Sequence, residues 1–423
     1  MSLVILREYQ ETTVQYGVKN PYCILALSPG LGKTLIALEI ANRTKSKVLV
    51  VCPAYLIHNW VSEIKKFFPN KSCTYFKGKK DFYNVWDTEI VITSYGLLQH
   101  CEYLFEWADM VIADECQNLK SVQAKRTDLF HKLIYENSVE RCLLLTGTPI
   151  KNRVYELYSL IAICNYRPQL KDSPFLNRFP TYVSFADYFS IPVEKRINTK
   201  WGTKKLISWN GYRNIPELKE KYLRDIYIRF SAEEVLTELP DKVYKNILIE
   251  DISCPELVEA FNSFNEEHSK TAPDIKAQIA LAKAKFTVEY VKDLLETEDK
   301  VVVYSDHVLA AEEIAKQLGA TAITGSVPIE SRKRISENFV YGETRVLVAT
   351  IGSFSTGVTL IVANNMVFND YPWIPGDLEQ AEGRIARIGQ KNICVYHRIL
   401  GSIQDEYILN VVEEKTSTIK AVT

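Results

Sequence analysis

The segment SPGLGKT, residues 28–34, decides the fold of this chain together with its immediate surroundings. The apolar run YCILAL (22–27) precedes it and LIALEIANR (35–43) follows it, so the pattern predicts a buried strand, a glycine turn and a helix. Such a turn lets backbone N–H groups approach phosphate oxygens at the N-terminus of a helix, where the dipole favours negative charge. The strict pattern GxxxxGK followed by Ser or Thr is not met, because Leu27 stands at its first glycine position. We favour a phosphate-binding loop over a glycine turn that merely ends a strand.

Two side chains of this loop have chemical roles under that interpretation. Lys33 would reach the β and γ phosphates of a nucleotide, and the Thr34 hydroxyl would bind Mg²⁺. The residues of the loop that we expect to bind the nucleotide are Pro29, Gly30, Leu31, Gly32, Lys33 and Thr34.

A second motif, VIADECQ (111–117), is an apolar strand that ends in two carboxylates. Because ligands bind at the carboxyl ends of strands in α/β sheets, Asp114 would hold Mg²⁺ through water and Glu115 would polarise the attacking water. An Asp-Glu pair alone would be better explained as the start of a solvated loop, but the loop at 28–34 favours the catalytic interpretation. The strand-end turn at 145–152 is a weak signal, although its threonines could sense the acid pair or the phosphate.

The segment QAEGRIARIGQ (380–390) places Arg384 and Arg387 three residues apart, on one face if the segment is helical. Arginines that face a bound triphosphate from another lobe stabilise the charge of the transition state. A solvated basic helix face explains the same spacing equally well.

Short apolar runs bounded by turn residues alternate with amphipathic stretches along the chain, which is typical of parallel α/β sheets. The predicted strands are 22–27, 47–52, 89–93, 110–113 and 142–146 in the first half, and 301–305, 321–324, 345–350, 366–369 and 393–397 in the second. Helical spacing within 57–67 and 310–318 predicts helices that cover these sheets. The stretch from about 160 to 285 predicts helical and irregular insertions around a crossing segment, ELPDK (238–242). The predicted fold class is therefore α/β, with two similar parallel-sheet lobes in tandem.

Length and composition limit the class of protein. A chain of 423 residues with 47% hydrophobic and 24% charged residues suggests two to three folded domains. No apolar run is long enough for a membrane span, and Arg7 and Glu8 interrupt any signal peptide, so we expect no membrane association and no secretion. The nine cysteines form no CxxC pair, which favours reduced thiols over a zinc site. The net charge of −1 by itself argues against a nucleic-acid binder.

An ordered series of motifs resembles the Snf2-family ATPases of helicase superfamily 2. The segments that carry the resemblance are LREYQ (6–10), PGLGKT (29–34), VVCPAYLIHNWVSEIKKFFP (50–69), ITSYGLL (92–98), DECQNLK (114–120), LLLTGTPIKNRVYELYSLI (143–161), VLVAT (346–350) and RIGQ (387–390). Three further stretches, at 209–218, 227–242 and 373–384, are similar to the annealing-helicase (HARP-like) branch of that family.

The resemblance implies two RecA-like lobes that use Mg-ATP. The domains expected from it are 1–165 as the ATP-binding lobe, 166–240 as a Snf2-type insertion and crossing segment, and 241–423 as the C-terminal lobe. The family pattern implies that adenine contacts Arg7 and Gln10, that Gly357 also contacts the nucleotide, and that Gln380 lies beside the arginine fingers Arg384 and Arg387.

Five positions depart from the family pattern. Leu27 and Ser28 stand where acidic residues are usual, Gln117 replaces a His, Gly383 replaces an Asp, and Ala386 replaces a His. None of these changes removes Lys33, Glu115 or either arginine, so we expect hydrolysis to be retained.

The resemblance also implies that double-stranded or branched DNA crosses both lobes through contacts with the phosphate backbone, independent of base sequence. The residues at the positions concerned are Asn59, Thr93, Ser94, Lys151, Ser305, Gly325, Ser326, Thr350 and Gly352, with Trp373 as a candidate for stacking or for packing. Basic clusters at 77–80, 151–153 and 332–334 could add charge, although each is better explained as an ordinary solvated face.

The predicted function is an ATP-dependent, DNA-stimulated translocase that remodels or re-anneals DNA. Two alternatives remain open: a helicase that separates DNA or RNA strands, and a catalytically silent adaptor that clamps DNA when nucleotide binds. We expect a monomer in the cytoplasm, nucleoid or host-cell cytoplasm, or in the nucleus of a eukaryote, directed by a targeting protein or by DNA structure.

Overall fold

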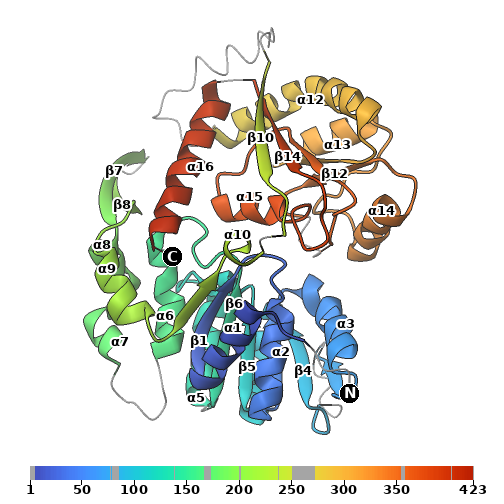
Figure 1. Ribbon diagram of the computed structural model, residues 1–423. Helices are drawn as coiled ribbons and strands as arrows, with labels where there is room; N and C mark the ends of the chain where they lie inside the picture. Colours follow the sequence, from blue (N-terminus) through green and yellow to red (C-terminus); the bar gives the residue numbers. More distant parts are fainter. Residues whose placement is uncertain are drawn as a thin grey trace. The chain divides into compact units, whose positions relative to one another are not determined.

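The computed structural model describes residues 5–76, 78, 85–137, 139–165, 173–199, 202–236, 238–249, 272–353, 358–401 and 403–422 of the chain. Two compact units divide it: Met1–Val235 together with Lys415–Thr423, and Leu236–Glu414. Each unit has its own parallel β-sheet (Figure 1), so the predicted α/β class with two parallel-sheet lobes is confirmed. Among the described residues, no helix has the length and apolar character that crossing a membrane requires.

The first unit is built on a seven-stranded sheet in the order β3-β4-β2-β5-β6-β1-β9, and every pairing in it is parallel. Its strands are β1 (Tyr22–Leu27), β2 (Val48–Cys52), β3 (Cys73–Tyr75), β4 (Ile90–Ser94), β5 (Met110–Asp114), β6 (Arg141–Thr146) and β9 (Tyr227–Phe230). Because all strands run the same way, the segments that follow β1, β5 and β6 leave the sheet at one edge.

The described residues of the first unit also form helices. They are α1 (Glu8–Lys19), α2 (Lys33–Thr44), α3 (Ile57–Phe67), α4 (Glu102–Trp107), α5 (Lys125–Glu136), α6 (Leu157–Asn165), α7 (Pro174–Arg178), α8 (Tyr182–Phe189), α9 (Ile215–Glu217) and α10 (Ala232–Val235). Short 3₁₀ helices occupy Ala54–Leu56, Tyr95–His100, Cys116–Leu119 and Val154–Glu156, and a π-helix occupies Leu218–Leu223. Alternate strand residues such as Leu49 and Val111 pack with Phe130 of α5 in one buried core. The helix predicted within 57–67 is α3, which buries Trp60 and Ile64.

The second unit has a five-stranded sheet in the order β10-β14-β13-β11-β12, again parallel throughout. Its elements are β10 (Lys242–Leu248), α12 (Ala272–Thr297), β11 (Val301–Ser305), α13 (Val308–Gln317), α14 (Ile329–Tyr341), β12 (Val346–Thr350), β13 (Asn365–Phe368), α15 (Pro375–Glu382), β14 (Cys394–Leu400) and most of α16 (Ile403–Val422), whose residues from Lys415 onward belong to the first unit. One sheet face packs against α12 and α13, and the other against α14, α15 and α16.

Two predictions of secondary structure were wrong. The segment 321–324 is not a strand, because only Ile323 pairs with the sheet, through a single bridge to Ala349. Part of the stretch predicted as helical or irregular forms an antiparallel hairpin, β7 (Ile191–Thr199) and β8 (Gly202–Asn210). Charged residues interrupt the apolar alternation of these strands, which hid the two-residue period.

Candidate active site

The loop after β1 has the backbone shape that a phosphate-binding turn requires. Gly30 and Gly32 have φ angles of +88° and +81°, in the left-handed region that favours glycine. Helix α2 begins directly after them at Lys33, whose Nζ donates to the carbonyl of Leu27 over 2.9 Å. A Cβ atom on Gly147, in the loop after β6, would lie 3.5 Å from Lys33 Nζ. The close approach of two loops leaves a cradle that a larger residue would fill.

The start of α1 braces this loop from the other side. Gln10 Nε2 and the Tyr9 hydroxyl each donate to the carbonyl of Leu31 over 3.2 Å. Gln10 Oε1 accepts from the backbone N–H of Arg7 over 2.9 Å, and the Arg7 side chain is exposed. A Cβ on Gly32 would come within 2.8 Å of Gln10 Nε2. Of the two residues predicted at the adenine, Gln10 therefore contacts the glycine loop directly, and Arg7 is bonded to Gln10.

Asp114 ends β5 with a buried carboxylate. Its Oδ2 accepts from Trp60 Nε1 over 2.8 Å and its Oδ1 accepts from the backbone N–H of Glu115 over 2.9 Å. Burial and the neighbouring charge of Glu115 raise the pKa of Asp114 to about 6, against the opposing effects of Trp60 and Lys33. Glu115 itself has a left-handed backbone with φ +51°. Strain of this kind persists only where the surroundings impose it.

A chain of polar contacts joins the acid pair to the loop after β6. Gln117 Nε2 donates to Glu115 Oε2, and Gln117 Oε1 accepts from the Thr146 hydroxyl over 2.7 Å. The backbone N–H of Thr148 then donates to Thr146 Oγ1 over 2.9 Å. Within the described part of the chain, Thr148 Oγ1 is buried without a hydrogen-bond partner. Gln117 thus connects Glu115, after β5, with Thr146 at the end of β6.

Glu156 is a functional candidate that the sequence analysis missed. Its Oε1 accepts from Lys120 Nζ over 2.7 Å, while its Oε2 accepts from the backbone N–H groups of Lys151 and Asn152 over 2.8 and 3.0 Å. Glu156 is buried and holds the shape of the segment that carries Lys151. Glu156 lies in the segment 143–161, which carries part of the family resemblance, and this was the only indication in the sequence. No local pattern marks a carboxylate that accepts from backbone N–H groups.

The four DNA-contact candidates of the first unit differ in accessibility. Asn59 is exposed on α3, and Lys151 is half-buried. Thr93 is fully buried with its hydroxyl 3.6 Å from Cys101 Sγ, and Ser94 is also buried. The structure therefore leaves the side chains of Asn59 and Lys151, and not that of Thr93, accessible from outside.

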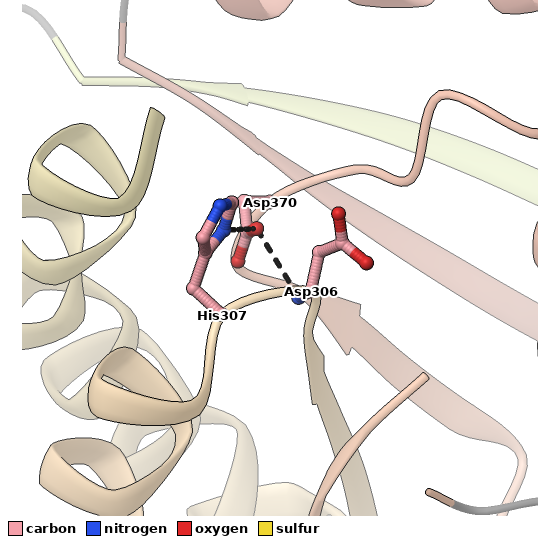
Figure 2. A group of neighbouring side chains, drawn as sticks. All are labelled: Asp306, His307 and Asp370. Atoms are coloured by element: carbon pink, nitrogen blue, oxygen red, sulfur yellow. Dashed lines mark hydrogen bonds and ion pairs between the residues drawn. The ribbon is translucent and has the colours of Figure 1, made fainter. Parts of the chain in front are cut away.

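In the second unit, Asp370 organises the turn that begins at Ser305. The Ser305 hydroxyl donates to Asp370 Oδ1, and Oδ2 lies 2.7 Å from His307 Nδ1 and 3.1 Å from the backbone N of Asp306. Figure 2 shows the His307 ring and the backbone N of Asp306 directed at Asp370, with the Asp306 carboxylate turned away. Burial raises the pKa of Asp370, but its bond with His307 and the nearby Lys283 charge outweigh burial and hold the pKa below its usual range.

Asp306, His307 and Asp370 are close enough together to hold a metal ion. A cation already serves this cluster, because Lys276 Nζ donates to Asp306 Oδ2 over 2.9 Å and to the Tyr371 carbonyl over 2.6 Å. We therefore assign the cluster a structural role, in which it stabilises the turn that begins at Ser305.

The two predicted arginine fingers do not share a helix face. Helix α15 ends at Glu382, and Arg384 and Arg387 lie in the turns that follow. The Arg387 guanidinium donates to the Gly383 carbonyl over 2.8 Å and to Thr359 Oγ1 over 3.0 Å. Tertiary contacts of these turns, and not helical spacing, fix the Arg387 side chain.

The other candidates of the second unit lie in different surroundings. Gly325, Ser326 and Gly352 are exposed, Ser305 and Thr350 are buried, and Trp373 and Gln380 are half-buried. Gly357 lies outside the described residues, as do Lys77, Lys79 and Lys80 of the cluster at 77–80.

Two side chains of the second unit have structural roles that the sequence did not indicate, although Arg332 belongs to the basic cluster at 332–334. Arg332 donates to the carbonyls of Gly325 and Ser353 over 2.8 and 3.0 Å, so it braces a candidate DNA-contact turn. Gln390 donates to the Ala363 carbonyl over 2.9 Å, and its Oε1 accepts from two backbone N–H groups. Both side chains form hydrogen bonds with backbone carbonyl or N–H groups. These partners come into reach only when the chain is folded.

The fold and the first-unit site together define a class: a two-unit α/β protein with a glycine loop before a helix and an acid pair at one edge of a parallel sheet. The family of this protein follows from sequence comparison. The SNF2-related domain matches residues 9–289, and the Helicase conserved C-terminal domain matches residues 284–389. The chain belongs to the SNF2-related family, which indicates nucleotide use and confirms the resemblance noted above.

Curated relatives agree with this assignment. The mouse "DNA annealing helicase and endonuclease ZRANB3" is 29% identical over 414 residues, which cover 90% of this chain and 37% of the relative. The Xenopus tropicalis "SWI/SNF-related matrix-associated actin-dependent regulator of chromatin subfamily A-like protein 1" is 28% identical over 97% of this chain and 44% of the relative. The Bacillus subtilis "Uncharacterized ATP-dependent helicase YqhH" is 26% identical over 94% of this chain and 75% of the relative. The chain thus lies near the annealing-helicase branch and spans about two fifths of the length of the two vertebrate relatives.

Among solved structures, the chain is similar to the "Sulfolobus solfataricus SWI2/SNF2 ATPase core in complex with dsDNA". The identity is 24%, the match covers 99% of this chain and 93% of that one, and the TM-score is 0.48.

Proposed function

We propose that this chain is a DNA-stimulated ATPase that translocates on double-stranded or branched DNA and remodels or re-anneals it. The observation that carries the proposal is the assembly of three loops at one edge of the first sheet. The Lys33 loop, the Asp114–Glu115 pair and the Thr146–Gln117 link come from strands β1, β5 and β6, which are neighbours in the order β5-β6-β1. Names of the relatives, which describe annealing and ATP-dependent helicases, support the nucleic-acid part.

The residues of this edge fit a nucleotide with Mg²⁺. The two left-handed glycines and the start of α2 offer backbone N–H groups to phosphate, and the cradle beside Gly147 leaves room for it. Thr34 and Asp114 offer the oxygen ligands that Mg²⁺ prefers, and the buried Thr148 hydroxyl leaves a polar group to be satisfied. A bound Mg²⁺ would neutralise the charge that develops on the transferred phosphoryl group.

Each protein group then has a defined task in hydrolysis. Lys33 exchanges its bond with the Leu27 carbonyl for phosphate, and its positive charge stabilises the transition state. Glu115 orients the attacking water, and Gln117 holds Glu115 in register with Thr146. We propose that Arg384 and Arg387 also act on the phosphates, as in the family pattern.

The turnover of ATP, measured against a panel of single-stranded, duplex, forked and four-way DNA with RNA alongside, tests this function. We expect duplex or forked DNA to raise the rate well above its DNA-free value. Lys33→Ala should lower turnover at least about 100-fold, because a transition-state donor is lost. Lys132→Ala is the matched control, since Lys132 is an exposed helix residue paired with Glu136.

Two outcomes would replace the proposal. Strand displacement on tailed substrates, absent on blunt duplex, would indicate a strand-separating helicase. Binding of ATP and DNA with no phosphate release would indicate a nucleotide-gated adaptor, and turnover that ignores every nucleic acid would refute DNA coupling.

A further inference from the structure

The hairpin β7–β8 is an element of the first unit that belongs to neither parallel sheet (Figure 1). It joins two nine-residue strands, Ile191–Thr199 and Gly202–Asn210, in antiparallel register. An isolated two-stranded hairpin is at best marginally stable in water. Its stability therefore has to come from its base or from what it binds.

The base of the hairpin is tied firmly to the rest of the unit. Trp209 Nε1 donates to Asp187 Oδ1 over 2.6 Å, and the Trp209 carbonyl accepts from Arg153 over 2.7 Å. The rings of Tyr155 and Tyr182 pack against Trp209 with centroids 5.8 and 6.1 Å away. These contacts fix the hairpin to the segment after β6.

That segment also carries a DNA-contact candidate. Arg153, which holds the hairpin, is two residues from Lys151, whose backbone is held by Glu156. The hairpin base and Lys151 are thus parts of one braced structure.

The hairpin is strongly basic in a protein that is close to neutral. Residues 191–210 contain five basic residues and one acidic residue, whereas the whole chain has a net charge of −1. Arg196 and Lys205 stand directly opposite each other in the register, and both side chains are exposed. Like charges in that position repel each other and destabilise a hairpin. Glu194 lies 3.4 Å from Lys205, but this pair is exposed and offsets little.

A phosphate backbone is the ligand that best fits this charge pattern. Arginine and lysine side chains a few ångströms apart bind successive phosphate groups and release counterions, with no reading of base sequence. Exposed apolar residues Leu206 and Ile207 lie next to Lys205 and would contact sugar or a frayed base. A surface that binds another protein is usually depleted of lysine, unlike this hairpin.

We propose that the β7–β8 hairpin is a second DNA-binding element, which binds the phosphate backbone through Arg196 and Lys205. These contacts add to those of the DNA-contact candidates elsewhere in the chain. This inference rests on the proposed function in one respect, namely that the chain binds DNA. It adds an element that explains how a protein without excess positive charge holds a duplex.

The test is the double variant Arg196→Gln/Lys205→Gln of the full chain, with binding to a fluorescein-labelled duplex measured at several salt concentrations. Each lost phosphate contact lowers the slope of log K against log salt by about 0.9. We therefore expect the slope to fall by up to about 2, and affinity at physiological salt to fall about tenfold or more. The matched control is Lys132→Gln/Lys221→Gln, which removes the same charge from two exposed helix or turn positions.

The thermal unfolding midpoint of each variant separates loss of binding from loss of folding. The hairpin variant should unfold no earlier than the wild type, because it removes a like-charge repulsion. An unchanged affinity and salt slope in a folded hairpin variant would overturn the inference and favour a protein ligand for this element. Equal losses in both variants would overturn it too, since they would reflect net charge alone. Because the readout is binding, a wild type that binds DNA without DNA-stimulated turnover would contradict the proposed function and not this inference.

Discussion

Trp60 Nε1 donates a hydrogen bond to Asp114 Oδ2 over 2.8 Å and so connects helix α3 with the end of strand β5. Trp60 is fully buried, and its position in the apolar stripe of α3 would suggest packing alone. The bond instead gives the carboxylate that we assign to Mg²⁺ a fixed orientation inside the protein. The residue that orients a ligand is as important to a metal site as the ligand.

The first prediction concerns this bond. Trp60→Phe keeps the aromatic packing but leaves a buried carboxylate oxygen without its donor, which should cost about 1–3 kcal/mol of unfolding free energy. Chemical denaturation measures the loss. Trp107→Phe is the matched control, because in the described residues Trp107 Nε1 is buried without a partner and its removal breaks no bond. A Trp60 variant as stable as the Trp107 variant would contradict the assigned role of this bond.

The second prediction concerns pH. The pKa of Asp114 is raised from its ordinary value of 3.8 to about 6, so the folded state binds an extra proton between those values. For this group, stability therefore falls as pH rises from about 4 to about 6. Mg²⁺ needs the ionised form, so turnover at limiting Mg²⁺ should fall as pH drops through about 6.

Added Mg²⁺ competes with the proton at Asp114 and should move this pH midpoint lower. A pH–rate profile recorded at two Mg²⁺ concentrations measures the shift. A midpoint that stays in place at both concentrations would show that Asp114 does not hold the metal.

The third prediction concerns the cradle beside the phosphate-binding loop. On Gly147, a Cβ would lie 3.2 Å from Pro29 Cδ and 3.4 Å from the Leu27 carbonyl oxygen, so Gly147→Ala must displace the loop by a few tenths of an ångström. We expect a higher KM for ATP and kcat lowered about tenfold, because displaced groups lose their alignment with the phosphates. Steady-state kinetics measure both constants. Gly96→Ala, whose Cβ would meet the Ser94 hydroxyl at an ordinary 3.8 Å, should behave like the wild type.

The fourth prediction concerns a buried ion pair in the second unit. Lys283 Nζ lies 2.7 Å from Asp405 Oδ1 and also donates to the Ile399 carbonyl over 3.0 Å. Lys283→Met removes the cation beside the buried Asp405 carboxylate, at a cost of about 3–5 kcal/mol. Adding Asp405→Asn should recover part of that loss, since the side chain still accepts from the backbone N–H of Gly401.

Urea unfolding of the two single variants and the double variant gives the coupling energy between them. Lys333→Met is the control, because Lys333 pairs with Glu337 over 3.9 Å at the surface. It should cost less than about 1 kcal/mol. A Lys283 variant as mild as this control would refute the pair's role in stability.

Much of the fold and part of the site followed from local pattern. The strand–turn–helix around 28–34 and the acidic pair after β5 were predicted because apolar runs and glycine turns act over a few residues. Local patterns also predicted α3 correctly. They wrongly predicted a strand at 321–324, where Ile323 forms only an isolated bridge. They also missed the β7–β8 hairpin.

The sequence by itself therefore determined the two parallel-sheet units, the glycine turn between β1 and α2 and the identity of the acidic pair, since these depend on periodicity and on residues next to one another. Only the tertiary structure decided that Trp60 orients Asp114, that Glu156 holds Lys151, that α15 ends before Arg384, and that Arg153 anchors Trp209. Most of these contacts join side chains to groups far away in the chain or to turns that exist only after folding. Their donors and acceptors meet because burial in the fold leaves a polar group no water to bind.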